Sequence, residues 1–71
     1  MGGKLAEQSE AIMAASDVVT LIRLAQGAAY RVKERAHGEA YARADSLSGE
    51  LQNLLREAEA MERQVKEDPT P

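Results

Sequence analysis

The chain has 71 residues, no cysteine and a formal net charge of −3. The lack of cysteine excludes disulfides and thiolate metal sites as sources of stability. A domain of this size buries only about 60% of the surface that its unfolded chain exposes. Phe and Trp are also absent and alanine supplies much of the hydrophobic content, so we expect partner helices to complete the core.

The N-terminus, Met1, Gly2 and Gly3, predicts a short flexible segment before the first helix. The most apolar run, residues 18–24, is too short to cross a bilayer and contains Arg23. A long apolar stretch of the kind found in signal peptides is also missing near Met1. We therefore expect a cytoplasmic protein that is not inserted in a membrane.

Residues 4–66 predict one helical region. Proline is absent before Pro69, most of the intervening residues favour helix, and the β-branched residues form no alternating pattern. Residues 67–71, which contain both prolines, predict a disordered tail. The expected fold class is therefore all-α.

Three places predict a bend in this helical region. Ser16 is a suitable N-cap, Gly38 weakens a helix, and small turn-compatible residues cluster between Ser46 and Gly49. The sequence leaves two arrangements open, one long helix or a two-helix hairpin bent at Gly38 or between Ser46 and Gly49. Either one would associate with partner chains as a helical bundle or coiled coil.

A single apolar stripe follows most of the helical region. Its members recur at steps of three or four residues with a mean of about 3.6, the period of an α-helix. From Leu47 onward the steps alternate strictly between four and three, as in a heptad seam. Small residues dominate between Ala25 and Ala44, which lets two helices approach closely. We expect the stripe to be a helix–helix interface, formed by Val18, Ile22, Ala25, Ala29, Val32, Ala36, Ala40, Ala44, Leu47, Leu51, Leu54, Ala58, Met61 and Val65.

Charge is segregated along the chain, with −2 on residues 1–22, +3 on residues 23–43 and −4 on residues 44–71. A parallel, in-register pairing would bring like charges together, so the pattern predicts antiparallel neighbouring helices. The bases of the middle segment do not share one helical face and have no aromatic residues interleaved with them. They predict ion pairs with acidic segments rather than a nucleic-acid partner.

Glu34 and His37 form a Glu-x-x-His pair, whose side chains would lie one turn apart on a helix. The pair resembles the Glu-x-x-His ligands of ferritin-like di-iron carboxylate proteins, in which other helices supply further glutamates. This resemblance implies a metal site if an oligomer brings two such pairs together. The alternative interpretation is an ordinary surface histidine.

Residues 48–52, Ser-Gly-Glu-Leu-Gln, resemble the Ser-Gln-Glu-Leu-Asp motif of small two-helix phosphatases that act on sporulation phosphorelays. Gly49 departs from that motif, and Gln52 replaces its acidic residue. The resemblance implies a regulatory phosphatase as a second alternative.

Chemical machinery of the usual kinds is not visible in the sequence. The single histidine has no cysteine to activate, and Gly2-Gly3 lacks the Lys-Ser/Thr ending of a phosphate-binding loop. We therefore expect neither enzymatic activity nor a cofactor. The leading hypothesis is a small helical module for protein–protein interaction that associates with itself or with a helical protein partner. It would act as an oligomerising adaptor, a secretion, phage or filament assembly component, or a stoichiometric regulator.

Overall fold

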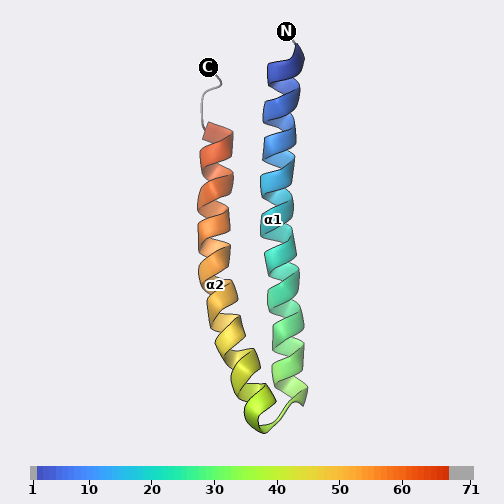
Figure 1. Cartoon of the computed structure of the whole chain (residues 1–71), viewed down its shortest axis with the longest axis vertical. Helices are drawn as coiled ribbons and strands as arrows, with labels where there is room; N and C mark the ends of the chain where they lie inside the picture. Colours follow the sequence, from blue (N-terminus) through green and yellow to red (C-terminus); the bar gives the residue numbers. More distant parts are fainter. Residues whose placement is uncertain (1, 68–71) are drawn as a thin grey trace.

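The protein is a hairpin of two antiparallel α-helices packed side by side (Figure 1). The computed structural model describes the backbone of residues 2–67 and the side chains from Ser9 to Glu67. Helix α1 spans Gly2–Arg35 and helix α2 spans Gly38–Glu67. The hairpin is about 57 Å long. The predicted all-α class is confirmed, and of the two arrangements left open the hairpin is the one observed.

The chain reverses direction at Gly38, the first residue of α2. Its φ of +62° lies in the left-handed region, which glycine enters without the steric cost that a Cβ atom brings. Just before it, the amide of Ala36 donates a hydrogen bond of 2.7 Å to the carbonyl oxygen of Val32, which closes the end of α1. Glu39 then places a carboxylate at the positive end of the α2 dipole.

At the other two predicted positions the helices are not interrupted, since Ser16 lies inside α1 and residues 46–49 lie inside α2. The physical reason is packing against the opposite helix, which outweighs weak helix propensity. Ser16 and Ser48 are both partly buried between the helices. Gly49 costs about 1 kcal/mol relative to alanine in a helix, which a helix of this length tolerates.

The predicted terminal segments fall only partly within the described residues. Gly2 and Gly3 belong to α1, and Glu67 is the last residue of α2. Met1 and residues 68–71 lie outside the residues that the structure describes.

The helices face each other along positions that alternate at steps of three and four residues, which we call the seam. Its most buried members are small, with Ala15, Val19, Ala29, Ala44 and Ala58 only 4–7% exposed. Small side chains let the two backbones approach closely. Among the side chains from Ser9 to Glu67, the set is Ile12, Ala15, Val19, Ile22, Gln26, Ala29 and Lys33 on α1, Ala36 just after it, and Ala44, Ser48, Leu51, Leu55, Ala58, Glu62 and Val65 on α2.

The seam is a thin core. Among the described residues, no large side chain is fully buried. Four seam positions carry polar side chains in place of apolar ones, namely Gln26, Lys33, Ser48 and Glu62. Burial of apolar surface is the main source of stability in a small domain, so this hairpin has little of it by itself.

Cross-helix contacts define the register of the hairpin. Residues level with one another have numbers that add up to 78, as for Ser16 with Glu62 and Gln26 with Gln52. The numbers of Arg23 and Glu59 add up to 82, four more than 78, so these two long side chains reach across about one helical turn. The register therefore says which residues of α1 and α2 lie at the same height, meaning the same position along the hairpin axis.

Candidate interaction surface

The seam divides the outer surface of the hairpin into two long sides of opposite character. Each residue of an α-helix is rotated by about 100° from the last, so residues just before and just after a seam position lie on opposite sides of it. Reversing the second helix also reverses the sense of this rotation. Residues that directly precede seam positions therefore share one side of the hairpin on both helices, and residues that directly follow share the other.

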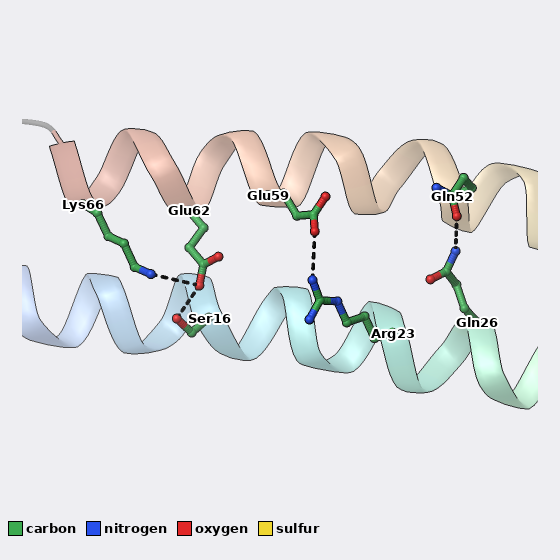
Figure 2. Close-up of polar contacts among 7 residues, drawn as sticks. All are labelled: Ser16, Arg23, Gln26, Gln52, Glu59, Glu62 and Lys66. Atoms are coloured by element: carbon green, nitrogen blue, oxygen red, sulfur yellow. Dashed lines mark hydrogen bonds and ion pairs between the residues drawn. The ribbon is translucent and has the colours of Figure 1, made fainter.

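The side formed by the following residues is polar, and its side chains connect the two helices (Figure 2). The Ser16 hydroxyl donates a hydrogen bond of 2.5 Å to the Glu62 carboxylate. Arg23 pairs with Glu59 at 2.9 Å. The amide of Gln26, in the seam, donates to the side-chain oxygen of Gln52 at 2.7 Å. We call this side the polar face.

The contact between Ser16 and Glu62 changes the acidity of the carboxyl group. The hydrogen bond donated by Ser16 favours the ionised form, and so it lowers the pKa of Glu62 below its ordinary value of 4.5. Partial burial opposes this change, and the ammonium group of Lys66, 3.7 Å away, adds to it. Glu62 is therefore a charged seam residue held in place by a neutral donor on the opposite helix.

Near the turn, Lys33 links both helices through three groups. Its ammonium nitrogen lies 2.7 Å from a carboxylate oxygen of Asp45. It also lies 6.0 Å from the ring centroid of Tyr30 and 5.7 Å from that of Tyr41, within the range of cation–π attraction. The hydrogen bond with Asp45 raises the pKa of Lys33 above its ordinary value of 10.5. Tyr30 and Tyr41, the two aromatic residues of the chain, therefore both lie near the Lys33 ammonium group at the turn end.

The side formed by the preceding residues carries large apolar side chains open to solvent, bordered by charged residues such as Glu50, Glu57 and Arg35. Leu21 is 64% exposed, Val32 and Leu47 are each 49% exposed, and Leu54 is 48% exposed. Large apolar side chains gathered on one side of a small protein are typical of a surface that binds another molecule. We call this side the apolar face, and it consists of Val18, Leu21, Ala25, Ala28, Val32, Leu47, Leu54 and Met61.

The predicted interface stripe is split between the seam and the apolar face. Its seam members are Ile22, Ala29, Ala36, Ala44, Leu51, Ala58 and Val65. Its members on the apolar face are Val18, Ala25, Val32, Leu47, Leu54 and Met61. The remaining member, Ala40, is exposed close to the turn. The middle of the stripe therefore points between the opposite helix and the apolar face.

A shallow hollow of about 480 Å³ lies at the turn end of the apolar face. It is lined by Ala28, Val32 and Ala36 together with the side chains of Arg31 and Arg35. The hollow is wide open to solvent, with two alanines and a valine among its lining and two arginine side chains beside them.

The residues of the two other predicted sites lie away from this surface. Glu34 is exposed at the end of α1, and His37 is exposed in the linker rather than on a helix. In the part of the chain that the structure describes, no three histidine or acidic side chains are grouped closely enough to hold a metal ion. Ser48 lies in the seam, and the amide of Gln52 is engaged by Gln26.

Helix α1 is rich in apolar residues over most of its length. Within this helix, Ser9–Arg35 is long and apolar enough to span a membrane, judged by length and composition alone. Core helices of water-soluble proteins and signal sequences share this composition. In this hairpin α1 presents apolar residues toward both the seam and the apolar face.

The polar contacts across the seam follow no motif in the sequence. Gln26 matches no motif, whereas the sequence favours Ser16 as an N-cap and places Gln52 in the phosphatase-like segment 48–52, and neither pattern indicates a contact between helices. A signal was present nonetheless, because Gln26 and Glu62 occupy steps of three and four residues from apolar neighbours. The ion pair between Lys33 and Asp45 agrees with the expectation that the middle bases pair with acidic segments.

Comparison with known proteins adds no relative to these observations, since no family model, curated protein or solved structure matches the chain.

Proposed function

We propose that this protein is a small interaction and assembly module, without enzymatic activity, whose apolar face binds helices of a second copy or of another protein. The complete unit is then a helical bundle in which this hairpin supplies two helices. The proposal fits an adaptor, a component of a larger assembly, or a regulator that acts by stoichiometric binding.

The observation that carries the proposal is the direction of the apolar stripe. In a hairpin that functions alone, the stripe of each helix is centred on the other helix, because that is the only place to bury it. Here the stripe is rotated toward the apolar face, and polar residues such as Gln26 and Glu62 occupy the opposite half of the seam. A helix of a four-helix bundle has this pattern, since it packs against two neighbours at once.

The thin seam supports the same conclusion. Val18, Val32 and Met61 remain 37–49% exposed in the hairpin. Burying a side chain of this size completely is worth roughly 1.5–3 kcal/mol relative to full exposure, so covering the face recovers a substantial part of that at each position. The stability that the hairpin lacks is available on this face.

Sedimentation equilibrium combined with substitutions on the apolar face tests the proposal. Leu54→Ser removes an apolar side chain from the face. Leu24→Ser is the matched control, because Leu24 is 64% exposed but lies two residues from the seam positions on either side of it and so points away from α2. We expect Leu54→Ser to weaken self-association by about tenfold or more, with little effect from Leu24→Ser. A wild-type chain that stays monomeric, folded and without a partner in pull-down experiments would contradict the proposal.

The two alternative functions stay predictions. The observed hairpin is the architecture that the resemblance to two-helix phosphatases implies, and a phosphatase assay with phosphorylated response regulators tests it. Elemental analysis after exposure to ferrous iron or zinc, repeated with His37→Ala, tests the metal-binding alternative.

A further inference from the structure

We infer that the molecule that covers the apolar face is a second copy of this chain, aligned turn to turn, with its α2 lying on α1 of the first copy. This inference rests on the proposed function and specifies the partner and its orientation. A two-fold axis parallel to the helices relates the two hairpins, so every pair of adjacent helices is antiparallel.

The two halves of the apolar face are complementary in shape. The α1 half carries Val18, Ala25 and Val32 at steps of seven residues, together with Ala28 and the shallow hollow near the turn, so this row forms a groove relative to the α2 half, with Leu21 exposed at its outer edge. The α2 half carries Leu47, Leu54 and Met61 at steps of seven residues, so it forms a ridge. A ridge of one helix packs best into a groove of another. The aligned arrangement places each ridge on a groove. In an inverted arrangement the turn of one copy lies beside the open end of the other, which places ridge on ridge and groove on groove.

The hairpin register fits this packing along the whole face. A two-fold axis parallel to the helices leaves heights unchanged, so a residue of α1 is level with the same residues in the second copy's α2 as in its own. Level residues have numbers that add up to 78, and the numbers of Ala25 and Leu54 add up to 79, so Ala25 of one copy lies within one residue, about 1.5 Å along the axis, of the level of Leu54 in the second copy. By the same rule, Val32 lies beside Leu47 of the second copy, and the ridge and groove stay in step.

The charges that border the face favour the same orientation. Along the outer edge of the α2 half lie Glu50 and Glu57, each directly before a seam residue. The corresponding edge of the α1 half carries Leu21 and Ala28, with Arg35 as its only charged residue in the described range. In the aligned arrangement the acids of one copy face this edge of the other. In the inverted arrangement α2 packs on α2, and the acids of both copies face each other.

The aligned arrangement also avoids a clash between bases at the turn end. Arg35 of one copy is level with Arg43 of the second copy, but helical side chains lean toward the N-terminus of their own helix. Arg35 therefore leans away from the turn, toward Glu50 of the second copy. Arg43 leans toward the turn, where it pairs with Glu39 of its own helix at 3.3 Å.

Disulfide cross-linking tests the inference directly, because the chain has no cysteine and each introduced thiol is unique. Chains with Ala25→Cys and chains with Leu54→Cys are mixed in equal amounts and oxidised mildly, and the products are identified by mass spectrometry. Both positions lie at the middle of the apolar face, which runs from Val18 to Val32 on α1 and from Leu47 to Met61 on α2, and there an inverted arrangement brings each residue close to its own counterpart. A third chain with Leu24→Cys is the matched control, because Leu24 lies off the face at the same height.

We expect the mixed product between positions 25 and 54 to predominate, with little self-linked product from either variant and little from the control. Self-linked products at both positions, without the mixed one, would show the inverted arrangement and overturn the inference while leaving the proposed function standing. Sedimentation equilibrium on the reduced variants shows whether the chain associates at all, and the cross-linked products then give the orientation. A monomer that floats with phosphatidylglycerol vesicles would show that a membrane covers the face and would overturn both proposals.

Discussion

Gly38 provides the sharpest test of the hairpin, because three glycines of the same chain should respond differently to the same substitution. Gly38 has a φ of +62°, whereas Gly27 and Gly49 lie inside helices without positive φ. A Cβ atom at Gly38 or Gly49 would have open space, and at Gly27 it would lie 4.0 Å from the end of the Arg31 side chain. Crowding is therefore not the cause of any difference among the three, and backbone conformation alone decides the sign.

The expected magnitudes follow from that backbone difference. An alanine in the left-handed region costs about 1–2 kcal/mol, and the loss of freedom in the unfolded chain returns about 0.4–1 kcal/mol of it. Gly38→Ala should therefore lower the free energy of unfolding by about 1 kcal/mol. Gly27→Ala and Gly49→Ala should raise it by about 0.5–1 kcal/mol each, because alanine is the better helix former.

Urea unfolding followed by far-UV circular dichroism measures all three variants, at one chain concentration because association would add to the apparent stability. Gly38→Asn is a useful fourth variant, since asparagine tolerates the left-handed region and should lose less than alanine does. Stabilisation by Gly38→Ala equal to that at Gly49 would refute the reasoning. It would mean that the chain is straight at this point and that Gly38 has an ordinary helical conformation.

Three further predictions concern the seam. Leu51→Ala should lower the free energy of unfolding by about 2 kcal/mol, since Leu51 is half-buried against α1. Leu54→Ala should instead mainly weaken association. Urea unfolding and sedimentation of both variants would distinguish these effects. Because Ser16 lowers the pKa of Glu62 below 4.5, the stabilisation from their contact is complete above about that pH and is lost as the pH falls through the lower folded value. Glu62→Gln should flatten this acid limb in unfolding measured from about pH 6 to about pH 3, and an unchanged limb would contradict the assignment. The hydroxyl of Ser48 is buried without a hydrogen-bond partner among the described residues. Ser48→Ala should therefore raise the free energy of unfolding by about 0.5–2 kcal/mol. A lower free energy of unfolding in the same urea assay would show that the hydroxyl is bonded.

The sequence by itself determined the helical class and the stripe of apolar residues. Helix propensity and a spacing near the helical period are local properties, so they can be read without knowledge of what packs against what. Charge segregation likewise indicated the antiparallel direction of neighbouring helices, and the two helices of the hairpin run that way, with Lys33 of the basic middle segment paired to Asp45 of the acidic one.

Only the tertiary structure decided where the chain turns and which half of the stripe the hairpin uses. Gly38 and the stretch between Ser46 and Gly49 are similar in local propensity, and they differ in the structure because residues 46–49 lie inside α2, with Ser48 and Leu51 partly buried, whereas Gly38 has a positive φ at the turn. The stripe has no local feature that separates Leu51 in the seam from Leu54 on the open face. That separation depends on how each helix is rotated about its axis, and the rotation is set by contacts between residues far apart in the chain, such as Ser16 with Glu62 and Gln26 with Gln52.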